Sequence, residues 1–421
     1  MILITIPIGI IFKDQSFTSL PFPKFALNKA SLAAVGSVGT TVASLTLVPL
    51  SDTVGRKPIM LLNMFGGAVV YLLLMIFGDV KNTGDAAFYL YAVGKLLSGV
   101  LGGSRTLSTV CIQDIFVDPV EKAKKSQAPM PLTVLGAAIG AVFGMIVFAS
   151  TGRLMAGGWV AMGLAVLGGT MFLFKVPSWA PPPKGSKEAE SKAASNAHLD
   201  AHDEAAFDKF DMDKSKDLPQ GVYRLIMLAS FLDNMGTQGL YSGLNIVLFT
   251  RFNYFVENPT EAAMASFGLI IFILFGLAVA IPSLKKRGPG QNAVIGNVST
   301  CLGQLILIFS TEIWVYLPIL YIGVSCSFYS TVAYMPMLIQ ITPAHMRGQI
   351  MGKYGAVSNF TSFFMPLVVA VMVDTAGEEV ALGVCAGFSL FATITAWPLM
   401  ARYVRPQITA LLCSTAANFP L

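Results

Sequence analysis

Long apolar runs separated by short polar stretches dominate the chain. A bilayer core of about 30 Å requires about 20 apolar residues in one α-helix. Eleven runs of this kind lie near residues 31–50, 58–78, 87–113, 129–149, 154–175, 222–250, 263–283, 292–311, 313–339, 349–373 and 380–401. Strands of a membrane barrel would instead alternate polar and apolar residues over segments of about 10 residues. The pattern therefore predicts an all-α membrane protein.

The first residues, MILITIPIGIIF, are apolar but too short to cross a bilayer. They lack the charged start and the small-residue cleavage site of a secretory signal. We interpret them as the end of a twelfth helix, the first in the chain, which is truncated here. We therefore expect the native protein to have a longer N-terminus.

Composition and charge agree with a multi-pass protein in a lipid bilayer. Hydrophobic residues make up 54% of the chain and charged residues 12%, whereas soluble domains contain about 25% charged residues. Basic residues gather in the loops on one side, at Arg56, Lys57, Lys122, Lys124, Lys125, Lys285, Lys286, Arg287, Arg347, Arg402 and Arg405. Because such loops usually face the cytosol, we expect cytosolic N- and C-termini. The net charge of +5 is explained in this way, and we expect no nucleic acid as a partner.

A polar stretch separates five of these runs from the other six, which gives six on each side when the truncated first helix is counted. Pro177–Pro219 is too polar to bury a core of its own. The sequence therefore predicts a six-helix bundle at 1–176, a disordered cytosolic linker at 177–220, a second six-helix bundle at 221–403 and a cytosolic tail at 404–421.

One part of this linker is similar to a calcium loop. In FDKFDMDKSKDL, acidic and hydroxyl side chains stand at alternate positions, at Asp211, Asp213, Ser215 and Asp217. Lys and Val occupy the places of the sharp-turn Gly and the closing Glu of such a loop. We interpret the stretch as a solvated acidic segment, with calcium binding as the alternative. The chain has no CxxC spacing, and we expect neither a metal nor a cofactor.

We expect the stretch SDTVGRK to form a basic, cytosolic loop of seven residues between the runs at 31–50 and 58–78, and it also has a specific pattern. Its region resembles the motif G-x-L-A-D-R-x-G-R-K-x-x-L, which joins the second and third helices in the major facilitator superfamily. The residues that match are Leu50, Asp52, Gly55, Arg56 and Lys57, and those that differ are Val48, Ser51, Thr53 and Met60. The resemblance implies the major facilitator fold, with twelve transmembrane helices in two six-helix bundles.

The resemblance also implies a latch at the cytosolic ends of the helices. Asp52 would face the positive N-terminus of the eleventh helix, and Arg56 would pair with Asp114 at the end of the fourth. Gly55 would permit the tight turn between the second and third helices, and Lys57 completes the basic part of the motif.

Further stretches resemble the drug and tetracycline antiporters of this superfamily. YAVGKLLSGVLGG resembles the fourth-helix R-x-x-Q-G motif, with Lys95 and Ser98 in place of Arg and Gln. GAAIGAVFG resembles the glycine-rich fifth-helix signature of antiporters, with Ala141 in place of its Pro. These glycines would also serve close helix packing alone. FLDNMG and RGQIMGKYGAVSNFTSFFMPL are similar to the same antiporter group.

In this family the first, fourth, seventh and tenth helices line the central cavity. The resemblance therefore implies that the substrate or coupling residues are Lys95, Arg105, Asp233, Asn234, Gln238, Tyr241 and Asn245. Ionisable residues inside a membrane are functional candidates. Lys95, which lies nearer the outer end, is alternatively an anchor that extends to the membrane surface.

Asp233 and Arg105 are predicted to lie at similar depth. Asp233 is 11 residues beyond Val222, or roughly 16 Å, and Arg105 is 9 residues from Asp114, or roughly 14 Å. An isolated carboxylate at that depth would stay neutral, whereas a nearby guanidinium would keep it ionised. Substrate that separates the pair would then favour protonation of Asp233. A static structural ion pair is the alternative.

Polar residues on the ninth and eleventh helices have a simpler explanation. Asn297, Gln304 and Asn359 lie in apolar runs, where amide side chains commonly bond one helix to another. We expect this structural role for all three.

These features predict a secondary active transporter that moves a small organic solute by alternating access, with protons as the coupling ion in an antiport. The alternatives are an uncoupled facilitative carrier and a receptor or scaffold with the same fold. We expect no enzyme, because no Walker loop, nucleotide fingerprint or catalytic triad is visible. We expect a monomer.

Overall fold

The computed structural model describes residues 25–77, 86–102, 104–115, 132, 135–136, 156–176, 219–242, 251–252, 259–342 and 347–402. Every regular element in these ranges is an α-helix, which confirms the prediction of an all-α protein. The predicted first helix, the linker, the tail and nearly all of the predicted fifth helix lie outside the described residues.

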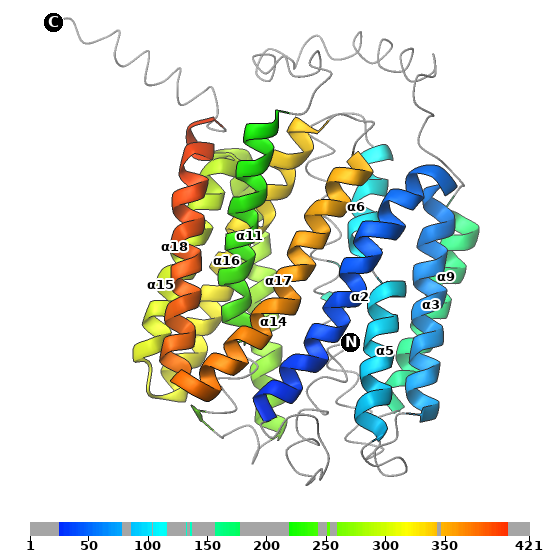
Figure 1. The fold of residues 1–421 in the computed structure, drawn as a ribbon, viewed down its shortest axis with the longest axis horizontal. Coiled ribbons are helices and arrows are strands. Elements are labelled where there is room, and N and C mark those ends of the chain that lie inside the picture. The colour runs from blue at the N-terminus through cyan, green and yellow to red at the C-terminus, as the bar shows by residue number, and fades with distance from the viewer. Residues whose placement is uncertain are drawn as a thin grey trace, which may run out of the picture.

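The described helices form two groups that lie side by side (Figure 1). The N-terminal group consists of α2 (Phe25–Val54), α3 (Arg56–Phe77), α5 (Ala86–Gly102), α6 (Ser104–Ile115) and α9 (Ala156–Lys175). The C-terminal group consists of α11 (Gln220–Ser242), α14 (Pro259–Arg287), α15 (Pro289–Phe309), α16 (Ile313–Ile341), α17 (Arg347–Ala376) and α18 (Glu378–Arg402). The predicted fourth helix corresponds to α5 and α6.

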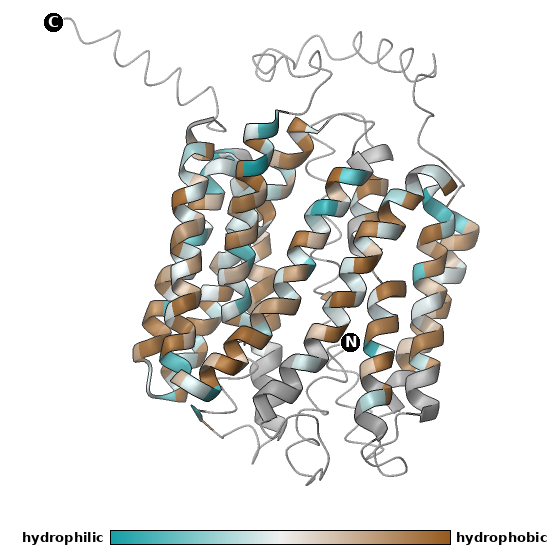
Figure 2. Ribbon diagram, viewed as in Figure 1, coloured by the Kyte–Doolittle hydropathy of each residue, from teal (hydrophilic) through white to brown (hydrophobic). Residues whose placement is uncertain are grey.

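Large apolar side chains cover the outside of both groups. Phe174, Phe309 and Trp314 are among the most exposed, and Figure 2 shows apolar residues along the outer helices. Five described helices are long and apolar enough to cross a membrane. Lipid is therefore the medium in which these faces are stable, because hydrocarbon chains are as apolar as the side chains themselves.

Single glycines connect consecutive antiparallel helices. Gly55, between α2 and α3, has a φ of 100°, and its amide donates to the carbonyl of Ser51 at 3.2 Å. Gly377, between α17 and α18, has a φ of 94°. Side chains with a Cβ rarely adopt this conformation, so the predicted turn at Gly55 is confirmed. The expected seven-residue loop is wrong, however, because a residue with positive φ reverses the chain within one position.

These two turns mark opposite ends of the molecule, here named the Gly55 end and the Gly377 end. In Figure 1 the Gly55 end is at the top and the Gly377 end at the bottom. The sequence analysis expects the Gly55 end to face the cytosol.

At the Gly55 end one apolar cluster takes buried residues from both groups. Its members from the N-terminal group are Val48, Ile59, Met60, Leu107, Val110 and Cys111. Its members from the C-terminal group include Ile226, Ala293, Tyr334, Met337, Ile350, Met351 and Leu399. The core at this end therefore holds the two groups together.

The main described contact between the groups runs along α2 and α17, which lie side by side in the middle of Figure 1. A Cβ atom on Gly352 of α17 would lie 2.7 Å from the Ser44 carbonyl oxygen of α2. About two turns further along α17, the Asn359 amide donates to the Ser44 hydroxyl at 3.1 Å. The predicted structural role of Asn359 is thus confirmed.

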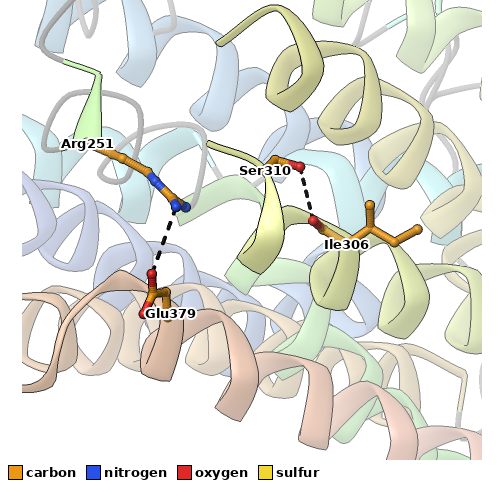
Figure 3. A network of polar contacts seen from close by, with 4 residues as sticks. All are labelled: Arg251, Ile306, Ser310 and Glu379. Atoms are coloured by element: carbon orange, nitrogen blue, oxygen red, sulfur yellow. Dashed lines mark hydrogen bonds and ion pairs between the residues drawn. The ribbon is translucent and has the colours of Figure 1, made fainter. Parts of the chain in front are cut away.

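At the Gly377 end, Arg251 approaches α18. Its Nη2 lies 3.9 Å from Oε1 of Glu379 (Figure 3), whose side chain is 67% exposed. Near this pair, the Ser310 hydroxyl donates to the Ile306 carbonyl at 3.0 Å and closes the last turn of α15. An ion pair with so exposed a partner contributes little to stability.

Candidate functional site

Two pairs of polar residues on α11 form two adjacent faces of that helix. Asp233 and Thr237 are four residues apart, as are Asn234 and Gln238. Residues at this spacing lie one above the other on a helix, so the two pairs point in directions about 100° apart. We name them the Asp233 face and the Asn234 face.

Asp233 lies inside the C-terminal group and is 3% exposed. Its Oδ1 accepts a hydrogen bond from the Ser330 hydroxyl of α16 at 2.8 Å. It also accepts a longer bond from the Thr237 hydroxyl at 3.5 Å. The carboxyl group therefore has neutral hydroxyl partners at the middle of a membrane helix.

A second polar pair lies beside the Asp233 face. Tyr334, one turn beyond Ser330 on α16, accepts a hydrogen bond at 2.9 Å from the Asn297 amide of α15. Both side chains are fully buried. The two helices approach closely because Gly296 has no side chain, and a Cβ there would meet the Ser330 backbone. The predicted helix-to-helix role of Asn297 is confirmed.

The Asn234 face packs against α17. The Ser358 hydroxyl donates to the Asn234 carbonyl oxygen at 3.3 Å, and the Gln238 amide donates to the Ser362 hydroxyl at 3.0 Å. Because Ser358 and Ser362 are also four residues apart, the two helices meet in a regular ladder of side-chain bonds.

Gln304 of α15 lies on a third side of α11. Its amide donates to the Gly236 carbonyl at 2.6 Å, and its carbonyl oxygen accepts a bond of 3.4 Å from the Ser389 hydroxyl of α18. Gln304 therefore joins three helices, which confirms its predicted structural role.

Two basic residues of the predicted site lie buried in the N-terminal group. Lys95 of α5 is 8% exposed, with its aliphatic chain beside Gly36 of α2. Arg56 is 2% exposed, and its guanidinium donates to the Ser51 hydroxyl across the Gly55 turn. Lys57, the next residue, is partly exposed. Burial of this kind is unlike that of an anchor at the membrane surface, which keeps its charge in water.

The remaining predicted site residues are placed only in part. Tyr241 is partly buried and packs against the apolar cluster of α14 and α16. Asn245 and the side chains of Asp52, Arg105 and Asp114 lie outside the described residues. The latch pairs and the pair of Asp233 with Arg105 therefore stay predictions.

The sequence analysis missed the hydroxyl partners of Asp233. Ser330 and Thr237 are ordinary residues in apolar runs and match no motif. A usable signal was present in SCSFYSTVAYM, where hydroxyl side chains are concentrated in a segment without a single charge.

Comparison with known proteins identifies the family. The model of the Major Facilitator Superfamily matches residues 1–366. The tetracycline resistance protein of class C from Escherichia coli is 24% identical over 329 residues, which cover 77% of this chain and 74% of that protein. The class B protein from the same organism is 23% identical over 326 residues, covering 77% and 73%.

Solved structures show the same fold. The human organic anion transporter MFSD10 superposes with a TM-score of 0.69 at 17% identity, covering 93% of this chain and 89% of that chain. The proton:xylose symporter XylE superposes with a TM-score of 0.70 at 15% identity, covering 95% and 93%.

Proposed function

Because the chain belongs to the major facilitator superfamily, and is thus an integral, multi-pass membrane protein, we propose that it exchanges a small organic solute for protons by alternating access. The observation that carries this proposal is Asp233, a carboxyl group 3% exposed inside a membrane helix. An ionised carboxylate there costs free energy, and an ionisable residue inside a membrane is therefore a functional candidate.

The partners of Asp233 support a group that gains and loses a proton. A hydroxyl group both donates and accepts hydrogen bonds, so Ser330 and Thr237 can bond to either form of the carboxyl. The packed helices α15 and α16 contain no Asp, Glu, Lys, Arg or His. A static ion pair would need a cation from elsewhere, and Arg105 is the residue that we propose to approach Asp233 when the cavity is empty.

Alternating access needs a contact between the groups that can open. The apolar cluster at the Gly55 end joins both groups, and Gly55 and Arg56 lie beside it. We propose that Asp52, Arg56, Lys57 and Asp114 form the latch that holds this end closed, and that it faces the cytosol.

The solute is proposed from the named relatives and from the predicted cavity. The curated relatives are tetracycline resistance proteins, so tetracycline is the first substrate to test. We propose that Lys95, Arg105, Tyr241 and Asn245 line its binding site.

The test uses the purified chain in proteoliposomes, with tetracycline, an organic anion and xylose as probes, with and without an imposed pH gradient. We expect a gradient to drive accumulation of one probe, because each pH unit supplies about 1.4 kcal/mol per proton. Asp233→Asn should abolish this accumulation and leave downhill exchange. Glu379→Gln removes an exposed carboxylate and serves as the matched control.

Other results would overturn the proposal. Uptake that is the same with and without the pH gradient would indicate a facilitative carrier. No uptake of any probe by a folded protein would indicate a receptor or scaffold. Gradient-driven accumulation by Asp233→Asn would show that the proton is bound elsewhere.

A further inference from the structure

Ser330 lies between two acceptors, and its hydroxyl can bond to only one of them at a time. We infer that Ser330 is a positioning residue for proton exchange, whose hydroxyl turns between the Asp233 carboxylate and the Ser327 carbonyl as Asp233 loses and gains its proton. This inference rests on the proposed proton coupling at Asp233.

The geometry gives the two positions of the hydroxyl hydrogen. Ser330 Oγ lies 2.8 Å from Asp233 Oδ1 and 2.9 Å from the Ser327 carbonyl oxygen. Both are ordinary hydrogen-bond lengths. Because a serine hydroxyl has one hydrogen and two acceptor lone pairs, the two bonds alternate.

Each protonation state of Asp233 selects one position. When Asp233 is ionised, the Ser330 hydroxyl donates to the carboxylate. When Asp233 is protonated, its own O–H donates to Ser330 Oγ, and the Ser330 hydrogen turns to the Ser327 carbonyl. Only a hydroxyl rotation separates these states, so the exchange needs no movement of the helices.

The Ser327 carbonyl tolerates the change, because it has a second donor. Thr331 Oγ1 lies 3.1 Å from the same oxygen. The carbonyl therefore keeps a side-chain partner when Ser330 turns towards Asp233. Inside the helix the same oxygen also accepts a backbone N–H, so the turn of Ser330 leaves no buried acceptor without a partner.

The other titratable groups near Asp233 are few. On α16, Tyr334 lies one turn beyond Ser330 and is bonded to Asn297, and Tyr354 of α17 packs against the apolar cluster that contains Tyr334. On α18, Cys385 packs against Gly239 of α11, and the charged residues of that helix lie at its ends. Arg105 of α6, whose side chain lies outside the described residues, is the charged partner that we propose for Asp233. Ser330 thus provides the shortest bond to Asp233 among the described residues.

Loss of the Ser330 hydroxyl affects the two states unequally. A hydrogen bond to an ionised group is about twice as strong as one between neutral groups. Ser330→Ala therefore destabilises ionised Asp233 more than protonated Asp233, and deprotonation then requires a higher pH. We expect the pH of half-deprotonation to rise by about one unit.

Infrared spectroscopy of the full chain in lipid tests this directly, without a known substrate. The carbonyl stretch of a protonated carboxyl group is followed against pH, and its absence in Asp233→Asn assigns the band. Ser330→Ala should raise the midpoint and move the band frequency, because the protonated carboxyl loses its acceptor. Thr237→Val, which removes the longer bond, should give a smaller shift. Ser327→Ala keeps its carbonyl and should leave both values unchanged.

The outcomes separate the two proposals. If no Asp233-dependent band titrates in the wild type, proton coupling at Asp233 is wrong. If the band titrates but Ser330→Ala leaves its midpoint and frequency unchanged, coupling stands and the role of Ser330 is wrong. An equal shift in Ser327→Ala would also overturn the role of Ser330, because it would indicate a general effect of altered packing in α16.

Discussion

The Asp233 face and the Asn234 face of α11 begin at neighbouring residues but have different partners. Asp233 is bonded to Ser330 of α16, inside the C-terminal group. Asn234 is bonded to Ser358 of α17, the helix that also contacts α2 of the other group. One face therefore holds an ionisable carboxyl group, and the other joins neutral amides and hydroxyls near the boundary between the groups.

Under the proposed function, the Asp233 face binds the proton and the Asn234 face takes part in the movement between the two groups. Side-chain hydrogen bonds between membrane helices contribute about 0.6 kcal/mol on average, so the Asn234 face can break and form at little cost. An ionisable group at the same depth costs about 3 kcal/mol or more when charged. A change in the charge of Asp233 therefore changes the free energy more than the loss of one hydrogen bond on the Asn234 face. The Asn234 face connects α11 to α17, the helix that contacts α2.

The largest expected effect comes from moving the carboxylate to the other face. In the double variant Asp233→Asn, Asn234→Asp, the side-chain composition of the two positions is exchanged. We expect no proton-driven accumulation of the probe, because the new carboxylate lies against α17 and not against Ser330. The accumulation is measured as gradient-driven uptake of the probe in proteoliposomes, with downhill exchange as the control. Full recovery by the double variant would show that the two faces are equivalent.

Arg56→Ala should have the next largest effect. The guanidinium is 2% exposed at the end where both groups pack together, and its loss should favour opening of that end. The labelling rate of a cysteine placed at Val48 in the apolar cluster should rise about tenfold or more, since the loss of a buried charged hydrogen bond is about 1.5–3 kcal/mol. Lys286→Ala, at an exposed basic residue near the end of α14 and outside the latch, is the matched control, and equal labelling in both variants would contradict the latch.

Gly352→Ala tests the contact between α17 and α2. The new Cβ would meet the Ser44 carbonyl, so the helices must separate, and we expect a loss of about 1–3 kcal/mol in stability. Thermal unfolding in detergent measures it. Gly387→Ala, where a Cβ has nothing within 4 Å, should be neutral or stabilising. A similar loss in both variants would show that the added methyl group destabilises the protein even where it meets no neighbour, and would contradict a specific contact at Ser44.

Gln238→Met gives the smallest expected change. It removes the bond to Ser362 and keeps the size of the side chain, so the exchange rate should change by about threefold. Its pH dependence should match the wild type, whereas Thr237→Val on the other face should shift it. The measurement is the exchange rate of each variant across a pH series. A shifted pH dependence in Gln238→Met would show that the two faces belong to one site.

Much of the helical framework follows from local pattern. Ten of the eleven apolar runs overlap a described helix of substantial length, because a helix in lipid satisfies its own backbone hydrogen bonds. The expected loop at SDTVGRK was too long for a different reason. The polar residues belong to the helix ends, and only Gly55 has the positive φ that turns the chain.

By itself, the sequence determined that α11 presents polar pairs at 233 and 237 and at 234 and 238, since the helical repeat places residues four apart on one face. Only the tertiary structure decided which helix each pair meets. Ser330 is 97 residues from Asp233, and Ser358 is 124 residues from Asn234. Among the described helices, which are mostly apolar on several sides, periodicity defines the faces of each helix but not their rotation towards a neighbour. That rotation is set by close approaches such as Gly296 against Ser330, which depend on the shapes of both helices at once.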